Sequence, residues 1–183
     1  VLVSGGIDIS FAVAASVVQY VAYQVLMALG GGNWWLGFAV AIVIGAALGA
    51  VNAALIHGFQ IISIVVTIAT FNVFFGLLMF TTRGVGIFNL PDWWAERMIL
   101  VEHQVAGGAW AELRLPVAVM VVAVLATAFL LRYTSTGRQL YAFGDNPEGA
   151  RRIGINVAAM RVIAFGWMGA MAGIAGLMQV NFV

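Results

Sequence analysis

The ionisable side chains of this chain lack the spacing of a catalytic or metal-binding centre. Glu102 and His103 are adjacent, so on a helix they point in different directions and form no obvious catalytic pair. The glycines at 84 and 86 are too few for a phosphate-binding loop, because the rest of the glycine pattern and a βα unit around it are lacking. No HExxH or Walker sequence occurs, and there is no cysteine to hold a metal or form a disulfide. The residues therefore predict no enzyme, no cofactor and no metal, and no ATP hydrolysis by this chain.

Charge gathers instead in residues 132–156, a basic segment between two long apolar stretches. Four arginines stand there against two carboxylates, a net charge of +2 (4 − 2). The inner part has the signals of a short helix: Asn146 is a good N-cap, Pro147 suits the first helical position, and Gly154 can take the left-handed conformation that ends a helix. A short helix with a start and a stop between two apolar spans is typical of a docking element. By charge alone, an ordinary arginine-rich cytoplasmic loop is the better explanation of the segment.

A second polar stretch interrupts the apolar sequence at residues 3–10, which read VSGGIDIS. Gly5 and Gly6 weaken a helix there, and a freed backbone cannot be satisfied by lipid. Asp8 is costly near a membrane unless it faces the interior of a bundle or water. Two interpretations stay open: Asp8 caps the following span at the membrane surface, or the stretch is a broken helix that lines a translocation path.

Polar side chains also recur within the apolar stretches. Ser16, Tyr20 and Gln24 lie four residues apart, so they share one face of a helix, and such a face should contact protein or water rather than lipid. Hydrogen bonds between helices explain this stripe as well as a path does. Asn52 lies deep in the next apolar stretch, where an amide more often stabilises packing than binds a ligand.

Aromatic side chains accompany an amide in the third apolar stretch. Thr67, Phe71 and Phe75 lie above one another on a helix, and Asn72 lies beside them. Aromatic faces can stack on the apolar face of a sugar while an amide bonds its hydroxyls, although ordinary packing explains the same pattern.

The elements that position these residues follow from composition. Of the 183 residues, 63% are hydrophobic and 8% are charged, which is typical of a polytopic membrane protein and leaves too much apolar surface for a soluble domain. The predicted fold is an all-α, polytopic transmembrane helical bundle with about five spans and a short cytoplasmic coupling helix. The expected spans are residues 9–29, 36–56, 61–80, 115–131 and 157–180, each close to the length that a bilayer requires.

Small residues and arginines predict how the spans pack and which way they run. Gly45 and Gly49 form a small-xxx-small pair, and the last span has a flat side of glycines at 169, 173 and 176. The 81–114 connection has three arginines against four carboxylates, a net charge of −1 (3 − 4), and its Trp93 and Trp94 indicate contact with the membrane surface. The positive-inside rule places 132–156 in the cytoplasm and 81–114 outside.

Two motifs carry a resemblance to a known family. Residues 141–157, YAFGDNPEGARRIGINV, resemble the cytoplasmic loop of the ribose-type, sugar-importing ABC transporter permeases, whose pattern is Gly-Arg, then Tyr-Ala-x-Gly-x-Asn-x-Glu-Ala-Ala, then Gly-Ile. Gly149 replaces the usual Ala, and Arg152 and Ile153 replace a Leu and a small residue. The VSGGIDIS stretch is similar to the Gly-Gly-Ile-Asp-Leu-Ser signature of the same family, with Ile9 for Leu. The resemblance covers essentially the whole chain and corresponds to the middle of the family's sequence.

The resemblance implies a domain organisation and an assembly. Residues 1–183 are expected to form a single transmembrane permease domain, incomplete at both ends, with 81–114 as an extracytoplasmic connection and 132–156 as the cytoplasmic coupling loop. The expected partners are ATP-binding cassette subunits, a periplasmic solute-binding protein, a second permease copy or a paralogue, a monosaccharide substrate and the lipid of the bacterial inner membrane, with no nucleic acid. The residues expected to couple to the ATPase are Gly144, Asn146, Glu148, Ala150, Arg151 and Gly154. Those expected along the substrate pathway are Asp8, Gln24, Asn52, Phe71 and Asn72.

Other functions stay open at this point. A related permease for branched-chain amino acids or nucleosides would share the architecture, although few charges lie in the spans to pair with a zwitterion. A membrane-embedded enzyme would need paired ionisable residues at one depth in the spans, where only Asp8 is found. A secondary transporter would usually carry carboxylates or histidines within its helices.

Overall fold

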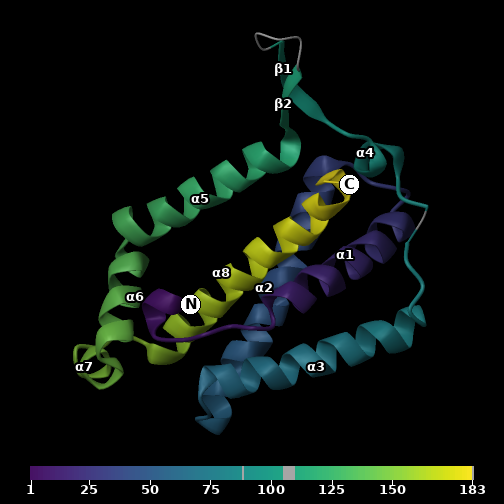
Figure 1. Ribbon diagram of the computed structural model, residues 1–183. Helices are drawn as coiled ribbons and strands as arrows, with labels where there is room; N and C mark the ends of the chain where they lie inside the picture. Colours follow the sequence, from purple (N-terminus) through teal and green to yellow (C-terminus); the bar gives the residue numbers. More distant parts are fainter. Residues whose placement is uncertain (88, 105–109, 183) are drawn as a thin grey trace.

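Five long helices dominate the computed structural model, which describes residues 1–87, 89–104 and 110–182 (Figure 1). All five are long and apolar enough to cross a membrane, which confirms the predicted polytopic bundle. They are α1 (Phe11–Ala28), α2 (Trp34–Phe59), α3 (Ser63–Thr82), α5 (Leu115–Tyr133) and α8 (Val157–Met178). Shorter elements join them: η1 (Leu2–Ser4), α4 (Asp92–Ala95), β1 (Ile99–Gln104), β2 (Trp110–Arg114), α6 (Ser135–Asp145), α7 (Pro147–Arg152) and η2 (Gln179–Phe182).

Local capping signals set the ends of α2. The side chain of Asn33 accepts a hydrogen bond from the Leu36 amide at 3.0 Å, so the helix begins directly after the glycine turn. At the other end α2 continues through Phe59 and stops at Gln60, which takes a left-handed φ of 54°. The span predicted to end at residue 56 therefore continues for three more residues, and His57 belongs to the last turn of the helix.

The centre of the bundle is the contact between α2 and α8, where glycines let the two backbones meet. A Cβ atom added at Gly45 would overlap the carbonyl of Gly169, and one at Gly49 would overlap the carbonyl of Phe165. The same holds in reverse at Gly173, whose neighbour is the carbonyl of Ala41. This confirms the predicted small-residue packing.

The connection between α3 and α5 is more ordered than its composition predicted. β1 and β2 form an antiparallel hairpin in which Glu102 lies opposite Glu112. The prediction that Trp94 contacts the membrane surface is wrong. Its side chain is 0% exposed, and its indole N–H donates to the Leu177 carbonyl at 2.7 Å. Trp93 donates to the Gly31 carbonyl at 2.8 Å, so both indoles attach this connection to the helix ends beneath it.

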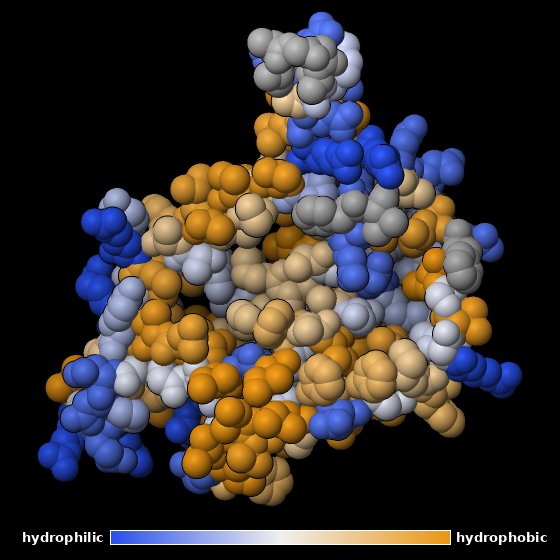
Figure 2. Space-filling view, viewed as in Figure 1, coloured by the Kyte–Doolittle hydropathy of each residue, from blue (hydrophilic) through white to orange (hydrophobic). Residues whose placement is uncertain are grey.

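Helix α5 packs more loosely than the other four. Only 6% of the residues in its apolar stretch are buried within the chain. Apolar side chains cover much of the molecular surface between the hydrophilic ends (Figure 2). One hydrogen bond joins α5 to α8, from the Trp167 indole to the Thr127 hydroxyl at 3.0 Å. Thr134 closes the corner between α5 and α6, because its hydroxyl bonds the Leu130 carbonyl and accepts from the Gly137 amide.

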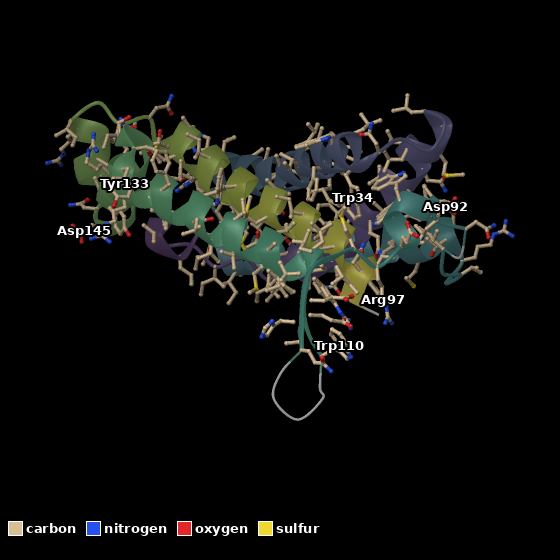
Figure 3. The ribbon with its side chains drawn as sticks, turned by 90° about the horizontal axis from the view of Figure 1, so that it is seen from above. Trp34, Asp92, Arg97, Trp110, Tyr133 and Asp145 are labelled. Atoms are coloured by element: carbon tan, nitrogen blue, oxygen red, sulfur yellow. The ribbon has the colours of Figure 1, made fainter. Side chains whose placement is uncertain are left out.

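The two ends of the molecule carry different loops, which makes the orientation testable. Tyr133 and Asp145 lie at one end and Asp92 lies at the other (Figure 3). Because the chain has no cysteine, single Asp145→Cys and Glu102→Cys variants can be labelled in vesicles of known orientation with a membrane-impermeant maleimide. We expect Asp145→Cys to react only from the cytoplasmic side and Glu102→Cys only from the outside. Labelling of both positions from the same side would contradict the orientation predicted from arginine bias.

Candidate functional site

The predicted short helix in the basic loop is confirmed as α7, and its ends follow the expected chemistry. The Asn146 side chain accepts a hydrogen bond from the Gly149 amide at 2.8 Å, and Pro147 occupies the first helical position. Gly154 has a φ of +86°, and the following amide of Ile155 returns to the carbonyl of Ala150 at 3.0 Å. The sequence did not predict α6, the 11-residue helix that precedes α7 and turns the chain away from α5.

The six predicted coupling residues divide into an exposed group and a packed group. Asn146, Glu148, Arg151 and Gly154 are exposed at the surface of the loop. Ala150 is 3% exposed and belongs to the apolar cluster that anchors α7 on the bundle. Gly144 lies on α6 against the backbone of Val3, so its environment is a packing contact inside the chain.

A polar cavity of about 370 Å³ lies between α7, the last turn of α2 and the start of α8. Glu148, Arg151, His57 and Arg161 are among its lining residues. The Arg161 guanidinium lies 3.4 Å from His57 Nδ1 and 6.0 Å from the centre of the Phe143 ring. Within the described part of the chain the one salt bridge joins Arg114 to Glu112, so the charges around this cavity have no ion-pair partner within the described residues.

The VSGGIDIS stretch interrupts the helices, which agrees with the broken-helix interpretation, while its place along a translocation path stays a prediction. Gly5 ends η1 with a φ of 71°, residues 6–9 are not helical, and α1 begins at Phe11. Asp8 is not the N-cap of α1: its Oδ1 accepts from the Ser10 amide at 2.8 Å and from the Ser10 hydroxyl at 2.7 Å. The Ser10 hydroxyl in turn accepts from Asn52 Nδ2 at 2.7 Å, so the half-buried Asp8 is joined to the buried Ser10 and Asn52 by a chain of hydrogen bonds.

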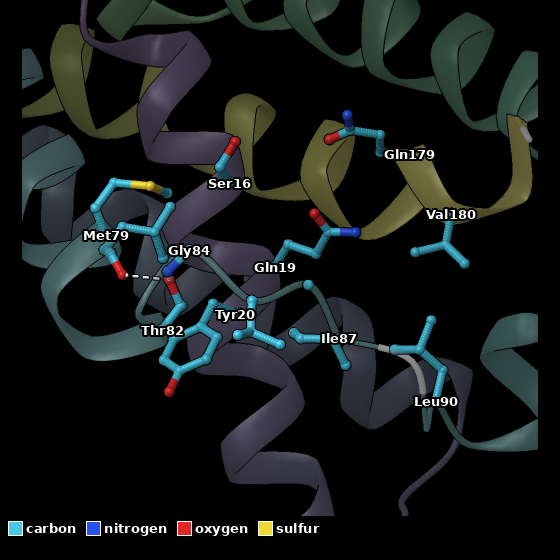
Figure 4. Close-up of a pocket in the computed structure, with 13 residues that line it drawn as sticks. Ser16, Gln19, Tyr20, Met79, Thr82, Gly84, Ile87, Leu90, Gln179 and Val180 are labelled. Carbon is cyan, nitrogen blue, oxygen red and sulfur yellow. Dashed lines mark hydrogen bonds between the residues drawn. The ribbon is translucent and has the colours of Figure 1, made fainter.

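A second cavity, of about 460 Å³, lies near the opposite ends of the helices between α1, α3 and η2 (Figure 4). Its polar lining consists of hydroxyls and amides, and no lining residue carries a charge at neutral pH. The Gln19 and Gln179 side chains enter it from two different elements, α1 and η2. The polar side chains are Ser16, Gln19, Tyr20, Thr82 and Gln179, and apolar side chains such as Leu78 and Met79 complete the wall. Neutral donors and acceptors between apolar surfaces suit a neutral, hydroxyl-bearing solute.

None of the predicted pathway residues lines this cavity. Gln24 is one turn farther along α1 and donates to the Tyr20 hydroxyl at 3.2 Å, so it positions a lining residue. Asn72 is exposed and donates to the carbonyl of Ile68 in its own helix at 2.8 Å. Phe71 stacks on Phe75, with ring centres 6.4 Å apart. Asn52 is 1% exposed, and its Oδ1 has no hydrogen-bond partner among the described residues.

Sequence reasoning noted Gln19 only as a neighbour of the polar stripe, and it missed two further polar residues of the cavity, Thr82 and Gln179. Gln19 stands beside the recognised stripe, one position from its register, so helical spacing of four did not select it. Thr82 and Gln179 lie at the ends of their helices, where polar residues are ordinary. They come together only where η2, the end of α3, residues 84–87 and Leu90 line the same cavity as α1.

Comparison with known proteins agrees with this architecture. The chain matches the family described as "Branched-chain amino acid transport system / permease component" over residues 1–183. The autoinducer 2 import system permease protein of Photorhabdus luminescens is 29% identical over 187 residues, covering 100% of this chain and 53% of the relative. The protein of the same name from Yersinia pestis (strain Pestoides F) is 31% identical over 190 residues, covering 100% and 50%.

The chain thus spans about half the length of the curated relatives it matches. No solved structure matches it. Because the family match extends over the whole chain, including all five spans and α7, the chain belongs to the family of permease components described for branched-chain amino acid transport systems.

Proposed function

We propose that the chain acts in the transmembrane permease of an ABC importer of the bacterial inner membrane and that it carries a monosaccharide or a related polyol. The observation that carries this proposal is α7, a capped helix presented at the end of the bundle with exposed Glu148 and Arg151. Such a helix can dock in a groove of an ATP-binding subunit and convert its closure into movement of the spans. The energy then comes from ATP hydrolysis on the partner, because this chain has no nucleotide-binding sequence.

The cavity of about 460 Å³ between α1, α3 and η2, called the outer cavity from here on, has a lining that supports a neutral solute. A zwitterionic amino acid would need charged or strongly polar partners for its carboxylate and ammonium groups, and the cavity lining has none that is charged. Amides and hydroxyls match the alternating donors and acceptors of a polyol. The relatives named for autoinducer 2 import support a small solute of this kind over the amino acid in the family's description.

The assembly follows from this proposal. A periplasmic binding protein delivers the solute to the end that carries the 81–114 connection, and ATP-binding subunits dock on the 132–156 loop at the other end. A second permease, either a copy or a paralogue, completes the path across the membrane. The predicted pathway residues Asp8, Gln24, Asn52 and Phe71 remain part of the proposal as residues next to that path, whereas Asn72, which is exposed and bonds its own helix, is placed outside it.

Uptake by the full-length permease with its ATPase and binding protein, measured in proteoliposomes, tests the proposal. Gln19→Leu removes an amide from the cavity. We expect uptake to fall about tenfold while ATP hydrolysis persists, because this is the typical effect of losing one hydrogen bond between uncharged groups. Asn72→Leu is the matched control, because that amide bonds its own helix outside the cavity. Equal uptake in both variants and the wild type would contradict the placement of the solute in this cavity. Uptake of a branched-chain amino acid in place of a polyol would contradict the substrate class.

A further inference from the structure

The non-helical residues 6–9 are held by side chains of α3 rather than by a regular backbone ladder. The Ile7 amide donates to the Ser63 hydroxyl at 2.9 Å, and the Ile9 amide donates to the Thr67 hydroxyl at 3.2 Å. The Thr67 hydroxyl also lies 3.4 Å from the Ile7 carbonyl and is 0% exposed. Ser63 and Thr67 are four residues apart, so their hydroxyls lie on successive turns along one face of α3. The two hydroxyls satisfy backbone groups that lipid would leave unpaired.

At its first end this segment is joined to α6 by backbone contact. Gly144 lies so close to Val3 that an added Cβ would overlap the Val3 carbonyl, and a Cβ at Gly5 would lie 3.5 Å from the Gly144 carbonyl. Two backbones in contact have no flexible side chain between them that could yield. A displacement of α6 must therefore move η1 and the segment that follows it.

At its second end the segment leads directly into α1, a wall of the outer cavity. Residues 6–9 bond α3 and precede α1 by a single residue, Ser10. The cavity lies between these same two helices: Ser16, Gln19 and Tyr20 come from α1, and Thr82 comes from α3. The spacing of α1 and α3 therefore sets the width of the cavity, and residues 6–9 are bonded across that spacing.

We propose that η1 and residues 6–9 form the mechanical link between the coupling loop and the substrate cavity. Ser63 and Thr67 are the positioning residues, because their hydroxyls hold residues 6–9 against α3 while these residues shift along the helix. Side-chain hydroxyls suit this role because each bond can break and re-form on a neighbouring backbone group without opening a helix. A docking movement of α7 displaces α6, the Gly144 contact carries it to Val3, and residues 6–9 shift along α3. This changes the separation of α1 and α3, which is a hinge-type closure of the cavity. The inference rests on the proposed function.

The test uses the full-length permease, reconstituted with its ATPase and binding protein, in which both hydroxyls are removed together as Ser63→Ala and Thr67→Val. We expect ATP hydrolysis to remain within about twofold of the wild type and uptake per ATP to fall about tenfold, the scale of one or two lost hydrogen bonds. Hydrogen exchange at the Ile7 and Ile9 amides should rise by a similar factor while exchange in α2 and α8 stays unchanged. Thr81→Val is the matched control, since that hydroxyl bonds the Leu77 carbonyl of its own helix.

A second pair of variants keeps the proposal falsifiable if the double variant does not assemble. Gly144→Ala introduces a methyl group at the α6 contact, whereas Gly58→Ala places one where nothing lies within 4 Å. We expect Gly144→Ala alone to lower uptake per ATP. Wild-type ratios in both the hydroxyl variant and Gly144→Ala would overturn the link while leaving the proposed function intact. A wild-type permease that imports nothing with an active ATPase would contradict the proposed function, and the link with it.

Discussion

Gly169→Leu is expected to abolish the packed bundle, with no folded protein recovered in detergent. The Gly169 backbone touches the backbone of Gly45 on α2, and an added Cβ would overlap the Gly45 carbonyl. No rotamer change relieves a contact between two backbones, so a leucine side chain must force the helices apart along their whole contact. Overpacking in a core costs up to about 3 kcal/mol and more where the backbone must move, which is a large part of the stability of a domain.

Size-exclusion profiles and thermal unfolding of detergent-solubilised protein measure this effect. Gly76→Leu is the control, because Gly76 lies in the middle of α3 with no atom within 4 Å of an added Cβ. It introduces the same side chain into a membrane helix and should leave a monodisperse protein. A Gly169→Leu variant that elutes and melts like the wild type would show that α2 and α8 do not meet at these glycines.

Gly154→Val is expected to uncouple ATP hydrolysis from uptake while the five spans remain folded. Gly154 has a φ of +86°, a conformation that costs a β-branched residue about 1–3 kcal/mol. The strain falls on the end of α7, where the Ile155 amide returns to Ala150 and closes the helix. If that free energy is lost from the coupled state, uptake falls by roughly 5- to 150-fold.

The measurement is uptake and substrate-stimulated ATP hydrolysis by the reconstituted complex. Gly154→Asn is the matched control, because asparagine adopts positive φ more readily than other non-glycine residues and should retain most of the activity. Equal loss in both variants would assign the effect to the side chain at this position, and wild-type coupling in Gly154→Val would remove α7 from the docking role.

The sequence was most informative where a local rule decides the structure. Long apolar stretches predicted the five spans, and Asn146, Pro147 and Gly154 predicted α7 because capping depends on residues within one turn. The small residues at 45 and 49 predicted a close helix contact but could not name α8 as the partner. Pairing of distant segments is set by tertiary packing, which one sequence does not display.

The rest escaped prediction for the same reason. Tryptophan is a residue type typical of membrane interfaces, yet the indole N–H of Trp94 donates to the Leu177 carbonyl at the end of α8. That carbonyl is 83 positions away in the chain. The paired strands β1 and β2 are exposed along nearly their whole length, so their sequence also fits a hydrophilic connection without strands. The charge of Asp8 beside an apolar span and the helical spacing of Gln24 predicted pathway residues, but the lining of the cavity depends on how α1, α3 and η2 converge, so it could not be read from any one helix.

The hydrogen bond between α5 and α8 attaches α5 at Thr127, about two thirds of the way along the helix from Leu115. With a rise of 1.5 Å per residue, the arm from Leu115 to Thr127 is about 18 Å long and the arm from Thr127 to Tyr133 is about 9 Å long. If α5 tilts as a rigid body about this bond, a displacement of about 1 Å at the α6 corner corresponds to about 2 Å in the opposite direction at the base of the hairpin.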